Sequence, residues 1–280
     1  MRRKGQSLEF RDFAAYTPGD DIRHVDWTAS FRHSLGEELL VKNFAAEEQM
    51  TLAISVDVRE SMKLPGSMPK LQIAAWLAEA VARIALASGD RVLFHPLFGQ
   101  GLPVFTVAGP GQASRIRETF QSWALQAGEE GKSNLDALRG RLPPACVWMI
   151  LTDVYFGSGQ VIRELSHQIG NARRGHRWIV LADLDSWPSE RAALGIGARK
   201  IEGPGLAYRT RWVDISHRTL RSVESRIEEH KTHFRELVDG AGLDWLSWHW
   251  PPNPEPDGLR FFKDRFFHDP VIRRLFMKET

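Results

Sequence analysis

Two carboxylates each follow a short apolar run of the chain, and a hydroxyl group accompanies each of them. Ser61 lies four residues after Asp57, and Ser133 precedes the short helical segment that leads into the run before Asp153. Carboxylate and hydroxyl oxygens suit Mg²⁺, which keeps several waters and takes few protein ligands. Asp57, Ser61, Ser133 and Asp153 are therefore the candidate metal ligands.

The apolar runs that precede these carboxylates are typical of buried parallel strands. Each is short and nearly free of polar residues, and a third run of this kind follows. The runs cover residues 50–58, 146–152 and 178–184, and helical patterns cover residues 70–88, 161–174 and 220–237. Strands that alternate with helices predict an α/β fold, a Rossmann-like doubly wound and mostly parallel sheet. Ligands bind such sheets at the carboxyl ends of the strands, which is where Asp57 and Asp153 lie.

The chain divides into three parts by composition. Residues 1–50 read as a β-rich extension with turns, residues 51–250 as the α/β domain, and residues 251–280 as a Pro-rich linker with an aromatic and basic tail. The tail either packs on its own domain or docks into a partner groove or onto a membrane surface. In the extension, we expect the carboxylates of Asp20, Asp21 and Asp26 to hydrogen-bond backbone amides at a turn or to pair with Arg11 and Arg23.

Charge and composition exclude several classes of protein. A net charge of +2 argues against a nucleic-acid binder, which usually carries a basic face. The single cysteine, Cys146, excludes an intramolecular disulfide, and no apolar stretch approaches the ~20 residues that span a bilayer. We therefore expect a cytoplasmic protein whose only membrane contact would be through the C-terminal tail.

Two motifs resemble known families. The segment Asp57-Val58-Arg59-Glu60-Ser61 resembles the Asp-x-Ser-x-Ser motif of the metal-ion-dependent adhesion site (MIDAS) in von Willebrand factor A domains. The segments 7–12, 16–23 and 25–30 closely resemble the signature of the bacterial family called domain of unknown function 58 (DUF58). The second resemblance extends over residues 5 to 250.

The resemblance implies a von Willebrand factor A-like domain with a β-rich N-terminal extension and without known catalysis. Many members are encoded beside MoxR-type AAA+ ATPases and are thought to assist the maturation or assembly of a client. It thus implies a non-catalytic protein-interaction module whose partner is such an ATPase or a protein client. In A-type domains a bound metal can complete its coordination with a partner carboxylate, so Arg59, Asp57 and Asp153 become the candidate partner-binding residues.

Arg59 makes this a degenerate metal site. It replaces the first motif serine, and Ser133 stands where the family has a threonine. Loss of a hydroxyl and gain of a positive charge would weaken Mg²⁺ binding. Alternatively, Arg59 could pair with Asp57 and Asp153 and stand in for the cation, since its planar fork matches carboxylates. If the Arg59 side chain instead points to solvent, the question of whether Mg²⁺ binds as a cofactor stays open.

Two other functions compete with this interpretation. A metal-dependent hydrolase on the same crevice would need a general base near Asp57, and none is apparent; Arg59 also holds the position where an Asp-x-Asp phosphatase has its second carboxylate. No complete Gly-x-x-x-x-Gly-Lys-Ser/Thr phosphate loop and no nucleophile elbow occurs in the chain. The second competitor is a membrane-peripheral scaffold that uses the tail at residues 257–280.

Overall fold

The computed structural model describes most of the chain as two separate units. The described residues are 9–17, 22, 25–34, 38–45, 50–107, 109–112, 115–127, 132–138, 140–143, 146–156, 159–175, 177–201, 211–253 and 258–276. Contacts divide the chain into an N-terminal unit, Met1–Gln49, and a C-terminal unit, Met50–Thr280.

The described residues of the N-terminal unit form an antiparallel strand pair and an α-helix. β1 (Glu9–Ala15) pairs with β2 (Leu40–Ala45), and α1 (Trp27–Ser34) lies between them in the chain. The helix is absent from the sequence prediction because eight residues with exposed Trp27 and Phe31 show no apolar period.

Asp26 stabilises the start of α1. Its Oδ1 accepts a hydrogen bond from the backbone N–H of Ala29 at 2.9 Å, and its Oδ2 lies 2.9 Å from Nζ of Lys42. The bond from Ala29 is of the predicted kind, a backbone amide donating to the carboxylate, and Asp26 also pairs with a lysine of β2. Asp20, Asp21, Arg23 and the side chain of Arg11 lie outside the described residues.

The C-terminal unit is built on a six-stranded sheet in the order β10-β7-β6-β3-β4-β5. All neighbouring strands are parallel except β4 and β5, which are antiparallel. The three apolar runs become the adjacent strands β3, β6 and β7, whose residues are buried on both faces. The strands are β3 (Thr51–Val56), β4 (Arg91–Pro96), β5 (Phe105–Val107), β6 (Val147–Thr152), β7 (Trp178–Asp185) and β10 (Asp244–His249).

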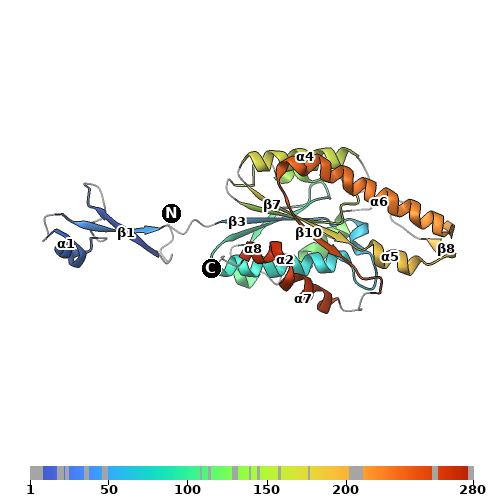
Figure 1. Ribbon diagram of the computed structural model, residues 1–280, viewed down its shortest axis with the longest axis horizontal. Helices are drawn as coiled ribbons and strands as arrows, with labels where there is room; N and C mark the ends of the chain where they lie inside the picture. The colour runs from blue at the N-terminus through green and yellow to red at the C-terminus, as the bar shows by residue number, and fades with distance from the viewer. Residues whose placement is uncertain are drawn as a thin grey trace. The chain divides into compact units, whose positions relative to one another are not determined.

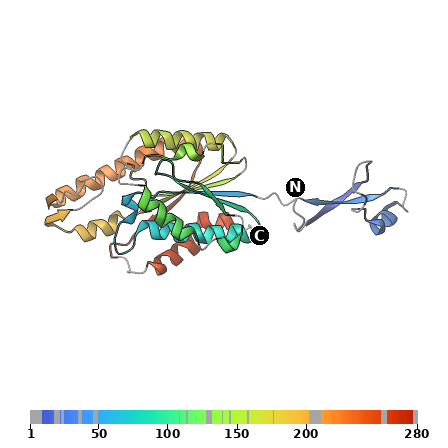
Figure 2. The same cartoon turned by 180° about the vertical axis from the view of Figure 1, so that it is seen from behind.

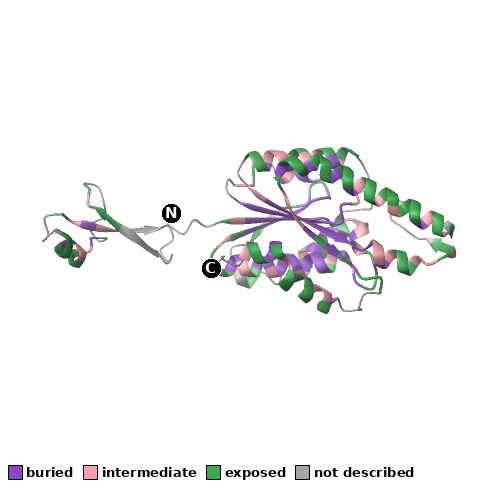
Figure 3. Cartoon of the chain, in the orientation of Figure 1, coloured by how far each residue is buried: buried purple, intermediate pink, exposed green. Residues whose placement is uncertain are grey.

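Helices cover both faces of this sheet, as Figures 1 and 2 show. One apolar core lies under α2 (Lys70–Ala87), α3 (Arg115–Gln126), α7 (Leu259–His268) and α8 (Pro270–Phe276). The other core lies under α4 (Gly159–Arg174) and α6 (His217–Val238). Figure 3 shows the strands buried between the two layers, with exposed residues on the outer helix surfaces. The predicted fold class, a doubly wound and mostly parallel α/β sheet, is confirmed.

Several shorter elements connect these layers. The helix predicted over 134–141 is only a 3-10 segment, η4 (Leu135–Leu138), because Asn134 is held by the loop after β4: its N–H donates to Leu97 O at 3.0 Å. The antiparallel pair β8 (Gly197–Ile201) and β9 (Arg211–Ile215) lies between α5 (Trp187–Leu194) and α6 in the chain. The other 3-10 segments are η2 (Glu60–Lys63), η3 (Pro110–Gln112) and η5 (Asp239–Ala241).

Residues 259–276 form two helices that pack within the C-terminal unit. Phe266, Val271 and Ile272 of α7 and α8 are at most 9% exposed and belong to the core that contains α2. Trp248 Nε1 of β10 donates to Asp269 Oδ2 at 3.0 Å, which fixes the junction of the two helices. The described part of residues 251–280 therefore fits the alternative in which this segment packs on its own domain, and the domain boundaries stay predictions. None of the described helices is both long and apolar enough to cross a membrane.

Candidate functional site

Asp57 and Asp153 lie at the same edge of the sheet. Asp57 follows β3 and Asp153 follows β6, and these strands are parallel neighbours. The backbone N–H of Asp57 donates to Leu151 O at 2.8 Å, which extends the strand pairing to the edge. Both carboxylates are fully buried. Two buried carboxylates at one edge require compensating charge.

Arg59 supplies part of that charge by folding back over both carboxylates. Its Nε lies 3.0 Å from Asp57 Oδ1, and its Nη2 lies 2.5 Å from Asp57 Oδ2 and 3.2 Å from Asp153 Oδ1. Nη1 donates to the carbonyl of Tyr155 at 2.9 Å. Arg59 thus pairs with both carboxylates and does not point to solvent.

Aromatic rings hold the guanidinium in this position. The Arg59 Cζ atom lies 4.3 Å from the ring centre of Phe98 and 5.3 Å from that of Phe156, distances typical of cation–π contacts. The side chain is only 12% exposed. Burial by itself would lower the pKa of Arg59, but Asp57 and Asp153 outweigh it and raise the pKa above its usual value.

Lys70, the first residue of α2, is a second buried cation at this edge. Its Nζ lies 3.1 Å from Asp153 Oδ2 and 3.3 Å from Glu190 Oε1, and its side chain is 1% exposed. Burial opposes the charged form, yet Asp153 and Glu190 raise the pKa of Lys70 overall. Burial alone would likewise raise the pKa of Asp153, and Lys70 and Arg59 reverse this and lower it.

Sequence reasoning missed Lys70, although a signal existed. Lys70 lies four residues before Ala74 and seven before Leu77, so it falls on the apolar stripe of its helix. A lysine in that position is either an end residue that reaches water or a cation buried against an acid. Because Lys70 pairs with Asp153, it is a buried cation.

The loop after β6 is strained and hydrogen-bonded to the site. Val154 has φ +60°, which is unusual for a β-branched residue. This turn lets the N–H of Tyr155 donate to Asp153 Oδ1 at 3.0 Å, and it presents the Tyr155 carbonyl to Arg59. Thr152 Oγ1 donates to Asp57 Oδ2 at 2.9 Å. Strain of this kind concentrates at functional sites.

The two serines of the predicted site differ in their surroundings. Ser61 Oγ in η2 is buried and has no hydrogen-bond partner among the described residues. Ser133 Oγ accepts a bond from the N–H of Leu135 at 3.3 Å, and the backbone of Ser133 bridges to that of Phe98. Within the described part of the chain, neither hydroxyl contacts Asp57 or Asp153 by a hydrogen bond.

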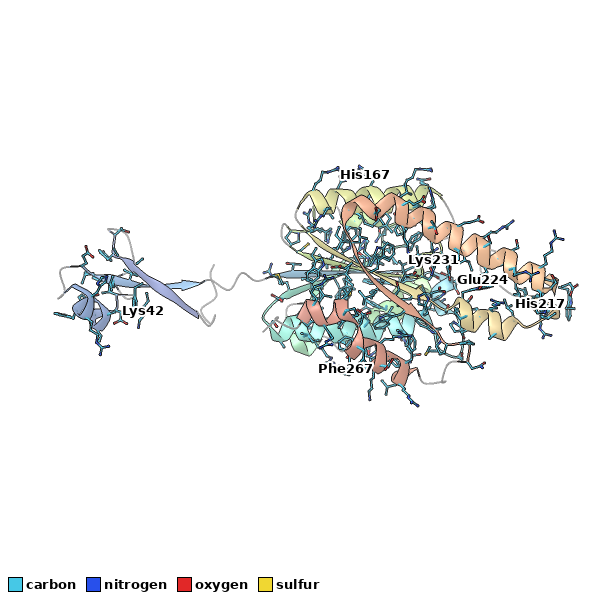
Figure 4. The ribbon with its side chains drawn as sticks, in the orientation of Figure 1. Lys42, His167, His217, Glu224, Lys231 and Phe267 are labelled. Atoms are coloured by element: carbon cyan, nitrogen blue, oxygen red, sulfur yellow. The ribbon has the colours of Figure 1, made fainter. Side chains whose placement is uncertain are left out.

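A second ionic cluster lies beside the first, at the end of β7. Lys231 of α6 is 3% exposed, and its Nζ lies 2.9 Å from Asp183 Oδ1 and 3.1 Å from Asp185 Oδ2. Figure 4 shows Lys231 over the sheet, whereas His217 at the start of the same helix lies at the outer end. Burial raises the pKa of Asp183, whereas for Asp185 the bonds from His249 and Lys231 outweigh burial and lower it.

Tyr155 joins the two clusters. Its hydroxyl donates to Asp185 Oδ1 at 2.7 Å, and its ring centre lies 5.3 Å from Lys70 Nζ and 5.1 Å from Lys231 Nζ. Neither acid of β7 is part of the predicted site, although Asp183 lies within the apolar run at 178–184 and Asp185 follows it directly. The end of that apolar run carries the same signal as the ends of β3 and β6.

The arrangement of donors does not fit Mg²⁺ as the residues lie. The position between Asp57 and Asp153 is taken by the Arg59 guanidinium, and Lys70 pairs with the other oxygen of Asp153. A divalent ion would have to displace the arginine and share Asp153 with an ammonium group. In the described residues, no group of three or more His, Cys, Asp and Glu side chains could hold a metal.

Comparisons with known proteins identify the family. The chain is similar to the crystal structure of the SpRpn10 VWA domain, with 10% identity, a TM-score of 0.40, and coverage of 80% of this chain and 96% of that one. It is also similar to the PilB minor pilin from Streptococcus sanguinis, with 13% identity, a TM-score of 0.31, and coverage of 85% and 64%. No curated protein matches the sequence. The model of the family described as "Protein of unknown function DUF58" matches residues 12–232, most of the chain, and the protein belongs to this family.

Proposed function

We propose that the protein is a non-catalytic protein-interaction module whose partner-binding face is the crevice at Asp57 and Asp153. The observation that carries this proposal is the Arg59 guanidinium, which bridges the two carboxylates where an A-type domain would hold a metal ion. The positive charge is thus built into the chain, and binding needs no Mg²⁺. The site is a degenerate metal-ion-dependent adhesion site that works through arginine.

A partner carboxylate is the group that this face would accept. Arg59 has five N–H groups, and one N–H of Nη1 has no hydrogen-bond partner among the described residues. A carboxylate from the partner would complete the cluster by a charge-assisted hydrogen bond. The family resemblance points to a MoxR-type AAA+ ATPase, or the client of such an ATPase, as the source, in the cytoplasm.

Titration with the MoxR-type ATPase encoded nearest to this protein tests the proposal. We expect a complex that survives EDTA and that Arg59→Ala weakens by about 2 kcal/mol or more, typical of a broken desolvated charge pair. Arg163→Ala, an exposed arginine of α4, is the matched control and should bind normally. A complex that EDTA dissolves and Arg59→Ala leaves intact would show that a metal supplies the charge.

The two competing functions have less support. A hydrolase would need a carboxylate free to act as a base, but Asp57 and Asp153 are both paired with buried cations. A membrane-peripheral scaffold would need the apolar side chains of α7 and α8 to be exposed, but Phe266, Val271 and Ile272 lie in the core. Phe267 is 63% exposed, and liposome binding that Phe267→Ser abolishes would favour the scaffold.

A further inference from the structure

A groove lies between the edge strand β5 and helix α3, away from the residues of the crevice. It has a volume of about 300 Å³, and all three residues of β5 line it. From α3 it is lined by Arg115, Thr119 and Trp123, which are spaced four residues apart and so share one face of the helix.

The floor of the groove is apolar. Trp123 is 2% exposed, and its ring centre lies 5.6 Å from that of Phe105. Phe105 also stacks on Phe94 of the neighbouring strand at 4.8 Å. A preformed apolar floor with few polar groups at its rim is typical of binding sites.

The strand side of the groove offers backbone hydrogen-bonding groups. β5 is the last strand of its sheet, so its outer edge has no neighbouring strand in the described part of the chain. In an antiparallel strand, alternate N–H and C=O groups point away from the paired neighbour. Because β5 has three residues, this edge can form only a short ladder, and side-chain contacts must supply the remaining affinity.

Arg115 gives the groove a charge preference. It is exposed, it is the first residue of α3, and among the described residues it has no ion-pair partner. The start of a 12-residue helix adds a partial positive charge at the same place. A carboxylate at this end of the groove is therefore favoured.

We propose that this groove binds an extended peptide segment of a partner protein by strand addition to β5. The segment places an apolar side chain on the floor formed by Phe105 and Trp123 and a carboxylate at Arg115. Strand addition draws affinity from main-chain bonds and specificity from such pockets. This site is independent of the crevice at Asp57 and Asp153.

Selection from a library of random ten-residue peptides on the full-length protein tests the proposal. We expect enriched peptides to combine β-branched or aromatic residues with Asp or Glu. The variant Arg115→Glu should select Lys or Arg in place of the acid, whereas Arg163→Glu on α4 should retain the acidic preference. Thermal unfolding of both variants confirms that they are folded.

Backbone methylation separates strand addition from side-chain binding alone. In the best peptide, N-methylation at alternate positions should weaken binding about tenfold, the cost of leaving a hydrogen-bond partner unpaired. Three results would overturn the proposal: no enriched peptide, a charge preference that Arg115→Glu leaves unchanged, or methylation tolerated at every position. Binding that depends on Arg59 instead would also overturn it, because the peptide would then occupy the crevice.

Discussion

Arg59 and Asp57, two residues apart in the chain, form a bidentate ion pair. Arg59 Nε lies 3.0 Å from Asp57 Oδ1, and Nη2 lies 2.5 Å from Asp57 Oδ2. The N–H of Arg59 also donates to Asp57 Oδ1 at 3.0 Å, so backbone and side chain fix the same carboxylate. Paired donors of this geometry give direction as well as energy.

The first prediction is that Arg59→Ala destabilises the C-terminal unit. The substitution leaves Asp57 buried without a cation, and it leaves Asp153 with Lys70 alone. Removing one partner from a buried ion pair costs about 3–5 kcal/mol. Urea denaturation should show this loss in the free energy of unfolding.

Arg163→Ala controls for the loss of an arginine as such. Its side chain is exposed on α4, and exposed charges contribute about 0–1 kcal/mol. Equal free energies of unfolding for the two variants would mean that the Arg59 pair does not stabilise the fold.

The second prediction concerns Mg²⁺. We expect no heat of Mg²⁺ binding from the unaltered protein, weak binding after Arg59→Ser, and tighter binding after Arg59→Ser with Lys70→Met. Each step removes one of the cations that hold Asp57 and Asp153. Isothermal titration calorimetry measures all three proteins. Tight Mg²⁺ binding by the unaltered protein, unchanged by Arg59→Ser, would mean that Arg59 does not affect Mg²⁺ binding.

The third prediction is a pH dependence from His95, which is fully buried. His95 Nε2 lies 3.0 Å from the carbonyl oxygen of Asn134, which can only accept, so Nε2 carries the proton. Nδ1, 3.0 Å from Ser55 Oγ, then accepts from the serine hydroxyl, which itself accepts from Trp148 Nε1 at 2.9 Å. Burial lowers the pKa of His95 from 6.5 to about 4.

The direction of the stability change with pH depends on the pKa of this histidine in the unfolded chain. Between pH 6.5 and about 4, His95 is protonated in the unfolded chain but neutral in the folded protein. Protonation therefore favours the unfolded state, and the folded state loses stability as the pH falls toward 4. The full contribution, present above pH 6.5, is about 3 kcal/mol. Urea denaturation from pH 4 to 7 should show this slope, and His95→Gln should flatten it. An identical slope in the variant would assign the pH dependence to other groups.

The strand ends were predictable because they are local features of the sequence. Asp57 and Asp153 each end an apolar run, and parallel strands bring such ends together. Arg59 was identified by its place in a motif, but the sequence could not show whether its side chain points to solvent or pairs with the carboxylates. That choice depends on Phe98 and Phe156, which are remote in sequence and flank the guanidinium.

The buried lysines show where sequence patterns stop being informative. Lys70 and Lys231 both lie on the inner stripe of an amphipathic helix, as Phe234, three residues after Lys231, indicates. A lysine is far more often exposed, and only the position of an acid across the interface makes burial favourable. Asp153 follows β6 and Asp183 lies in β7, and neither strand adjoins the helix of its lysine in the sequence, so these ion pairs appear only in the fold.

The fourth prediction tests the packing of the C-terminal helices with two adjacent residues of α7. Phe266 is 9% exposed and packs in the core with α2, whereas Phe267 is 63% exposed. Phe266→Ala removes a buried ring and leaves a cavity, which costs about 3–5 kcal/mol. Phe267→Ala removes a ring that is mostly in water, so its cost should stay below about 1 kcal/mol. Urea denaturation gives the free energy of unfolding of the two variants, which carry the same substitution at a buried and at an exposed position. Equal effects would mean that α7 does not pack on the sheet, and the apolar side chains of residues 259–276 would then be free for a partner or a membrane surface.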